Sequence, residues 1–382
     1  MSRAGTGPAA GVLLISLVIS SVPSPGAGSA LSTEHPALST QHPAPSPPYG
    51  RAIEQYRQGD VGAALDTLAR LAEDRTWTEA NRIWRWPRTD VSQWLPDAQA
   101  ALLLHTEAWF RGIQPASPRR PNLHIDCART LVRLLIEVMN DRQKSDQAAE
   151  QDRLFIHDWY LLVVSQLHGE REIGRSRWYL AEALKLFPND AAVLLAAGSD
   201  HEMLSAVAVG WVQYYDMAGQ KVVQKRVAPG EELRNAIRYY RAAMALAPDV
   251  GEVRLRLGRS LYRLGEFEEA AQHLEVVRSR TPAMPLRYLA DVFLGLAEVA
   301  RGRRARARAL YDHAMQLYPR GQAPYVALSE LEYLEDRPAE AATVMTGLLQ
   351  TKHKDDPWWI YLLGEWWHIE ARIKSLRERV RR

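Results

Sequence analysis

The feature that most constrains this chain is a spacing of 34 residues in its second half. Pro248 and Pro282 are 34 positions apart, and the residues between them form two stretches of helical apolar spacing separated by Gly265. A repeat of this length is typical of arrays in which each unit is a helix, a turn and a second helix. The spacing therefore predicts a helical repeat protein whose units pack mainly against their neighbours.

The residue types within this unit have physical reasons. Gly258 and Ala270 have small side chains where two paired helices touch, which permits close approach. Gly265 suits the turn, and Pro282 ends the second helix. In this order the residues resemble the tetratricopeptide repeat. The resemblance implies an all-α fold, a right-handed superhelical solenoid of antiparallel helix pairs, and protein or peptide binding.

The same pattern recurs along the chain. One further unit ends at Pro319, and another has Asp336 in place of the turn glycine. Upstream, a first helix near 190–198 is separated from its second helix by an insertion from about 204 to 230. We therefore expect degenerate repeats over 49–185, and repeats with a tryptophan-rich C-terminal capping helix over 186–382.

The first residues predict export. Arg3, an apolar stretch from Ala9 to Ile19, and small residues and prolines through Ala30 follow the order of a secretory signal peptide. The apolar stretch is shorter than the ~20 residues that span a bilayer, so we expect cleavage after Ala30 and no transmembrane segment in the mature chain. An uncleaved leader or a misassigned start codon is the alternative.

A Pro/Ser-rich segment follows, and residues 31–48 are predicted to be a disordered linker, because proline at this density blocks helices and sheet ladders. The leader and this linker together predict a repeat protein of the exported bacterial type, located in the periplasm or secreted.

Composition excludes several classes of protein. A net charge of +3 over 382 residues argues against a nucleic-acid binder with a broad basic face. The single cysteine, Cys127, excludes an intramolecular disulfide and a multi-cysteine zinc site. Asp200-His201-Glu202 is the densest polar triplet, but adjacent helical residues point in different directions and do not converge on one metal. We expect no catalytic residue, metal or cofactor, and no enzyme activity.

The resemblance also implies where a partner binds. In this family the first helices of the pairs line a concave groove. Counting from the Leu-Gly pairs gives seven candidate partner contacts on that face: Arg259, Tyr262, Arg263, Glu330, Tyr333, Glu365 and His368. The primary hypothesis is therefore a non-enzymatic scaffold in the cell envelope that holds a protein or peptide in this groove.

A local cluster of basic residues supports a rival hypothesis. It spans a turn and the start of a second helix, and it consists of Arg301, Arg303, Arg304, Arg306 and Arg308. Such a cluster binds anions, which would make the protein an envelope-assembly or enzyme-accessory factor for an anionic glycan or lipid. A solvated turn in an arginine-rich protein is the alternative interpretation of the same residues.

Overall fold

The computed structural model describes residues 47–73, 91–113, 123–141, 147–206, 211–215, 222–226, 228–350, 356–364 and 368–381. The predicted signal peptide, most of the predicted linker and Glu365 lie outside these residues. The last two residues of the predicted linker are helical, because the first helix begins at Pro47.

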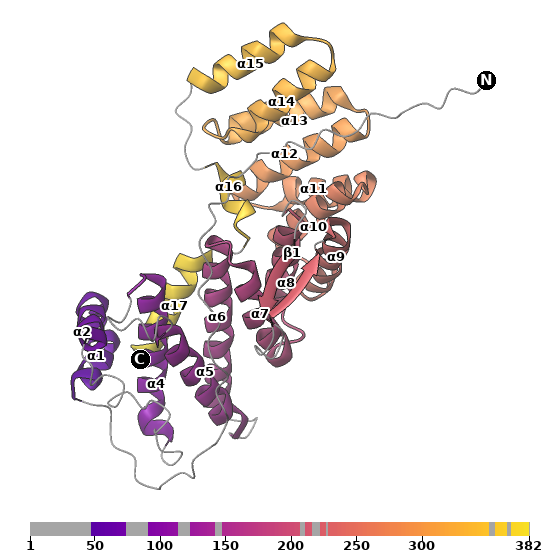
Figure 1. The fold of residues 1–382 in the computed structure, drawn as a ribbon. Helices are drawn as coiled ribbons and strands as arrows, with labels where there is room; N and C mark the ends of the chain where they lie inside the picture. The colour runs from indigo at the N-terminus through magenta and orange to yellow at the C-terminus, as the bar shows by residue number, and fades with distance from the viewer. Residues whose placement is uncertain are drawn as a thin grey trace. The chain divides into compact units, whose positions relative to one another are not determined.

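The first half of the described chain is helical. Its helices are α1 (Pro47–Arg57), α2 (Val61–Glu73), α4 (Val91–Phe110), α5 (Leu123–Asp141), α6 (Gln147–Gly169) and α7 (Ile173–Leu186) (Figure 1). Consecutive helices pack as pairs: α1 with α2, α4 with α5, and α6 with α7. Trp159 and Phe155 of α6 are fully buried in the shared core. Among the helices described, none is long and apolar enough to cross a bilayer.

The second half repeats one arrangement. The pairs are α8 (Ala191–Ser205) with α9 (Pro229–Leu246), α10 (Gly251–Leu264) with α11 (Phe267–Arg280), α12 (Met284–Ala300) with α13 (Arg304–Leu317), and α14 (Ala323–Leu334) with α15 (Pro338–Gln350). Each second helix before α15 also packs against the first helix of the next pair. This series confirms the predicted fold class, a helical solenoid of antiparallel pairs.

Glycine recurs in the sequence because the turn between two paired helices needs a left-handed backbone conformation. Gly265 and Gly302 have φ values of 94° and 76°, a left-handed conformation that glycine adopts without steric cost. Asp336 stands at the same place in the last pair and also adopts a positive φ, 58°. Asparagine and aspartate tolerate this region better than other side chains, so the turn is kept without glycine.

The insertion between α8 and α9 contains the strands that the structure describes. β1 (Trp211–Tyr215) and β2 (Val222–Arg226) pair in antiparallel orientation, with Trp211 opposite Arg226. β1 packs against α7. The helical fold prediction did not include this hairpin.

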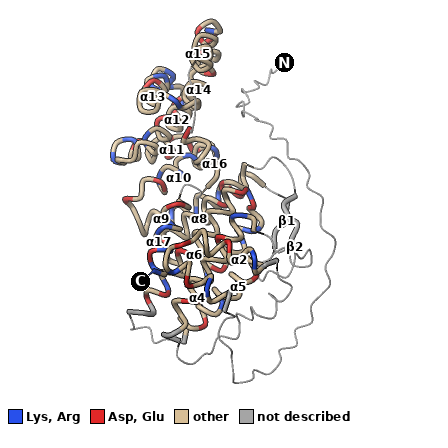
Figure 2. The backbone as a smooth tube through the Cα atoms, turned by 90° about the vertical axis from the view of Figure 1, so that its left-hand side faces the viewer, with Lys and Arg blue, Asp and Glu red and all other residues tan. Residues whose placement is uncertain are grey.

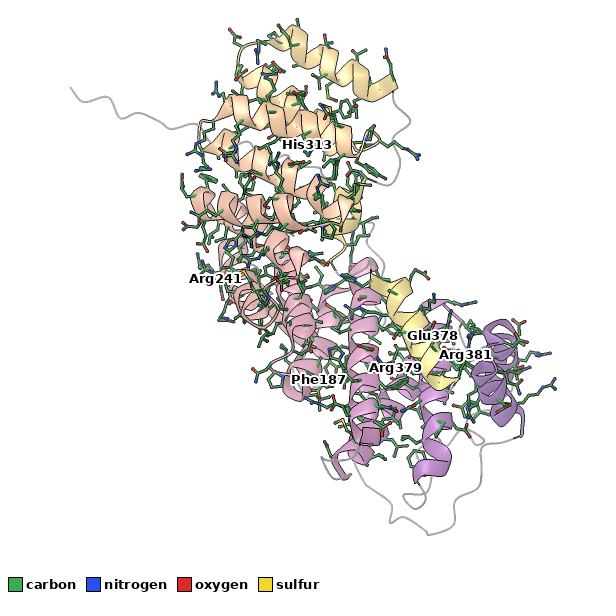
Figure 3. All side chains as sticks on the ribbon, turned by 180° about the vertical axis from the view of Figure 1, so that it is seen from behind. Phe187, Arg241, His313, Glu378, Arg379 and Arg381 are labelled. Atoms are coloured by element: carbon green, nitrogen blue, oxygen red, sulfur yellow. The ribbon has the colours of Figure 1, made fainter. Side chains whose placement is uncertain are left out.

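In place of the single C-terminal capping helix that was expected, the structure describes two helices after α15. After α15 the chain forms α16 (Pro357–Leu362), which packs against α12, and α17 (Ile369–Val380), which packs against α6 and α4. Arg379 of α17, which Figure 3 labels, donates a hydrogen bond of 2.7 Å to Asp158 of α6. Arg377 donates one of 2.8 Å to the buried Glu107 of α4. α17 therefore packs on the N-terminal core and pairs with these two acidic residues, and it does not lie beside α15.

Candidate functional site

The inner face of the repeats is partly covered by the chain's own C-terminal segment. We give the name inner face to the side on which the first helices α8, α10, α12 and α14 pack against one another. The hydroxyl group of Tyr361 in α16 donates a hydrogen bond of 2.8 Å to a carboxylate oxygen of Glu202 in α8. Arg256 of α10 donates one of 2.7 Å to the backbone carbonyl of Gly364. Residues 356–364, which we call the covering segment, therefore lie on α8, α10 and α12.

Arg259 has a different role from the one predicted. It lies on the inner face as expected, but only 9% of its surface is exposed. Its guanidinium group lies 4.9 Å from the ring centroids of both Trp358 and Tyr361 and donates a hydrogen bond to Glu202. Arg259 thus binds the covering segment and is not free to contact a partner, which corrects the sequence-based assignment.

Two other candidates also belong to internal contacts. Arg263 donates a hydrogen bond of 2.7 Å to the side chain of Ser205, at the end of α8. His368 lies 2.9 Å from Glu252 of α10. Burial opposes ionisation of Glu252, but Arg256 and His368 outweigh it and lower its pKa to about 2. Arg263 and His368 therefore have internal partners, and their contact with another protein stays a prediction.

Glu202 is the centre of the buried network. Besides Tyr361 and Arg259, it accepts hydrogen bonds from Tyr240 at 2.9 Å and from Arg256 at 3.5 Å. Burial raises the pKa of a carboxylate, but Arg259 and Arg256 outweigh that effect, so the pKa of Glu202 is lowered. A charge that is buried needs such partners, because it is otherwise costly to remove from water.

The neighbours of Glu202 in sequence point elsewhere, as their adjacency predicted. Asp200 accepts hydrogen bonds from Ser176 at 2.6 Å and from Arg177 at 2.7 Å. His201 lies 2.6 Å from Glu232 of α9. In the part of the chain that the structure describes, no three His, Cys, Asp or Glu side chains form a group able to hold a metal ion. The triplet joins α8 to α7, α9, α10 and α16.

Three of the predicted contacts remain on the open part of the inner face. Tyr262 of α10 is half-buried, whereas Glu330 and Tyr333 of α14 are exposed, Tyr333 to 71%. Glu330 and Tyr333 are three residues apart in one helix, so they share a face. Burial and the Glu330 carboxylate raise the pKa of Tyr262. We call these three residues the tyrosine patch.

The predicted anion patch is largely neutralised. Four of its five arginines pair with carboxylates: Arg301 and Arg303 with Glu298, Arg306 with Glu275, and Arg308 with Glu335. Arg304 is exposed. These pairs leave little net positive charge to attract an anionic ligand.

Comparison with known families agrees with the geometry of the pairs. The family model described as tetratricopeptide repeat matches residues 231–288, which span α9, α10, α11 and the beginning of α12. This chain carries tetratricopeptide repeats. Tetratricopeptide repeats generally act as protein-binding scaffolds and present extended concave surfaces to their partners. No curated protein sequence matches the chain significantly.

Several solved structures of tetratricopeptide-type proteins are similar at low identity. Pseudomonas aeruginosa pilF is 18% identical, with 58% of this chain and 88% of that chain covered and a TM-score of 0.41. A tetratricopeptide repeat protein from Parabacteroides merdae is 11% identical, with coverage of 74% and 92% and a TM-score of 0.45. A chain of the APC/C hetero-tetramer Cut9–Hcn1 is 16% identical, with coverage of 87% and 62% and a TM-score of 0.37.

Proposed function

We propose that this protein is an exported, non-enzymatic scaffold that binds a segment of another protein at the tyrosine patch. The observation that carries the proposal is the division of the inner face. The covering segment lies on α8, α10 and α12, whereas Glu330 and Tyr333 are exposed and Tyr262 is half-buried. Tyrosine is a frequent anchor of protein interfaces, because its ring supplies apolar area and its hydroxyl group a hydrogen bond.

The covering segment suggests the chemistry that this face accepts. It binds through aromatic rings stacked on Arg259 and through a backbone carbonyl that accepts from Arg256. A partner segment with an aromatic or apolar anchor fits the adjacent tyrosines, and the exposed carboxylate of Glu330 favours a basic residue beside that anchor. A peptide or an exposed segment of a folded protein satisfies both conditions.

The leader pattern supports a location in the cell envelope. Residues 1–30 have the order of a signal peptide, although they lie outside the residues that the structure describes. Intact-mass measurement of protein recovered from the envelope fraction tests this part of the proposal. A mature chain that retains Met1 to Ala30 contradicts it.

Binding is tested by quantitative capture of proteins from envelope extract with immobilised protein. The double variant Tyr262→Ala/Tyr333→Ala is expected to capture the bound partner at least about thirtyfold more weakly, because truncated interface aromatics typically cost about 2 kcal/mol or more. The double variant Arg303→Ser/Arg304→Ser is the matched control, since both arginines are exposed and lie outside the patch. It should capture the same partner as the unaltered protein.

The opposite pattern of binding by the two variants would support the rival hypothesis of an anionic ligand. If the arginine variant loses the ligand and the tyrosine variant keeps it, an anionic glycan or lipid at the arginine cluster replaces the protein partner. Far-ultraviolet circular dichroism of each variant establishes that the helices are intact.

A further inference from the structure

The covering segment lies on the helix pairs with one of its sides only. Its buried residues are Asp356, Pro357, Tyr361 and Gly364, whereas Trp359 is exposed and the others are half-buried. In Figures 1 and 2, α16 lies alongside the series of pairs, at the level of α10 and α12. The segment is therefore seated on the surface of the repeats in the way that a bound peptide is.

The carboxylate of Asp356 is held between two helix pairs. It accepts a hydrogen bond of 3.0 Å from the hydroxyl group of Tyr288 in α12. It also accepts hydrogen bonds of 2.6 and 2.9 Å from the backbone nitrogens of Gln322 and Ala323, at the start of α14. The first N–H groups of a helix have no partner within the helix and favour a negative charge. The inner face thus has a site for a carboxylate that comes from outside the pairs.

Two aromatic rings of the segment are bound next to this carboxylate. Besides their contact with Arg259, the rings of Trp358 and Tyr361 both meet the buried Phe293 of α12 edge-on, with centroid distances of 5.3 and 5.2 Å. Because the two residues are three positions apart in α16, they share one face of that helix. The inner face therefore recognises an aspartate followed by aromatic residues two and five positions later.

The surface beneath the segment is rich in charge. It presents the side chains of Glu202, Arg256 and Arg259. The first two bond to polar groups of the segment, the hydroxyl group of Tyr361 and the backbone carbonyl of Gly364. When the segment leaves, water hydrates these charges, which offsets part of the loss of contacts.

α17 is attached in a different way. Its buried side chains belong to the hydrophobic core of the N-terminal helices: Ile373, Leu376 and Val380. Exposing such apolar groups to water is unfavourable. The covering segment is thus the part of the C-terminal region that can detach while α17 stays in place.

We propose that the surface beneath the covering segment is a peptide-binding site, which the chain occupies with its own segment until a partner segment of the same chemistry displaces it. The partner segment has an aspartate, with aromatic residues two and five positions later. This proposal rests on the proposed function in one respect, the binding of protein segments at the inner face. It adds a second, covered site and the sequence that this site recognises.

Fluorescence anisotropy of a labelled synthetic peptide with the sequence of residues 354–364 tests the proposal. The full-length variant Trp358→Ala/Tyr361→Ala, which we call the released variant, loses the rings of the tethered segment and keeps the surface beneath it. It should bind the peptide about a hundredfold more tightly than the unaltered protein does. An effective concentration of about 1 mM for the tethered segment, against a Kd of about 10 µM for the peptide, gives this ratio.

Two controls establish that the peptide occupies the same site. A peptide with alanine at the positions of Trp358 and Tyr361 should not bind the released variant. Arg259→Gln, added to the released variant, should weaken binding of the original peptide at least about tenfold, because the guanidinium group lies against both rings. Equal affinity of the peptide for the released variant and the unaltered protein, or binding that does not depend on Arg259, overturns the proposal.

Hydrogen exchange of the unaltered protein gives a second measurement that needs no variant. The hydrogen-bonded backbone amides of the covering segment, among them those of Trp358 and Gly364, should exchange at least about tenfold faster than those of α17, through local opening. Equal protection would mean that the segment opens only when α17 does, and overturns the proposal. Tyr262→Ala/Tyr333→Ala should bind the peptide as the unaltered protein does, so failure of this site is distinguishable from failure of the tyrosine patch.

Discussion

The hydroxyl group of Tyr361 donates a hydrogen bond of 2.8 Å to Glu202, although the two residues are 159 positions apart. Glu202 also pairs with Arg259 and Arg256, and all four side chains are buried. The bond thus joins the C-terminal covering segment to a buried ionic cluster between the helix pairs.

Removing the charge of Glu202 should be costly. Glu202→Gln leaves the buried Arg259 without its carboxylate and Arg256 with Glu252 as its acidic partner, so the free energy of unfolding should fall by about 3 kcal/mol or more. Tyr361→Phe removes one hydrogen bond and should cost only about 1 kcal/mol. Urea denaturation followed by circular dichroism measures both. Equal effects of the two variants would mean that the ionic cluster does not stabilise the fold.

Acid should destabilise the N-terminal helices through a buried histidine pair. His105 and His124 contact each other through ring nitrogens 3.0 Å apart, and His105 also contacts the hydroxyl group of Tyr49. Burial lowers the pKa of both, that of His124 to about 4 from an ordinary value of 6.5. The unfolded chain therefore takes up protons at higher pH than the folded chain, and stability present above pH 6.5 is lost as the pH falls towards 4.

The size of this effect follows from the shift of His124 alone. Between about pH 7 and about pH 5 the free energy of unfolding should fall by about 2 kcal/mol. His124→Gln removes this titrating group and should flatten that part of the profile. Chemical denaturation of the two proteins at a series of pH values gives the comparison, and parallel profiles would refute it.

Adding a side chain at Gly258 should force the paired helices apart. A Cβ atom there would lie 2.7 Å from Cγ of Leu274 and 3.3 Å from the carbonyl oxygen of Ala270. Gly258→Val should therefore lower the free energy of unfolding by more than about 2 kcal/mol. Gly347→Ala is the control, because a Cβ atom at Gly347 meets nothing within 4 Å. Unchanged thermal unfolding of Gly258→Val would show that this contact relaxes freely.

The turn at Asp336 should prefer glycine. Because Asp336 has a φ of 58°, Asp336→Val should destabilise the protein by about 1–2 kcal/mol, whereas Asp336→Gly should be neutral or stabilising by less than about 1 kcal/mol. Differential scanning calorimetry orders the three proteins. A valine variant as stable as the glycine variant would contradict the left-handed turn.

The helix pairs could be predicted because their spacing is local. Gly258, Gly265 and Ala270 each serve a contact within one unit, so the sequence of that unit carries the signal. Asp190 is likewise a local signal, because it is the N-cap of α8. Its side chain accepts hydrogen bonds from the backbone nitrogens of Ala192 and Val193. Local requirements of this kind are repeated along the chain and therefore stand out as periodicity.

The position of the C-terminal helices could not be predicted in the same way. The aromatic spacing around Trp358 is typical of a helix that covers apolar surface, but it does not say which surface. The choice depends on distant partners, such as Glu107 for Arg377 and Asp158 for Arg379. For the same reason the sequence did not show that Arg259 is covered, because the residues that cover it come about a hundred positions later.

The packing of the C-terminal helices on earlier helices affects how the repeat array unfolds. In a simple repeat protein each unit contacts only its neighbours, so unfolding can start at one end and spread. Here α17 holds α4 and α6, while the covering segment holds α8, α10 and α12. Fraying of the C-terminal residues therefore removes support from both halves at once, and the ends of this array are not independent of its middle. Such long-range closure raises contact order and slows folding, because residues as far apart as Arg377 and Glu107, which are separated by 270 positions, must meet.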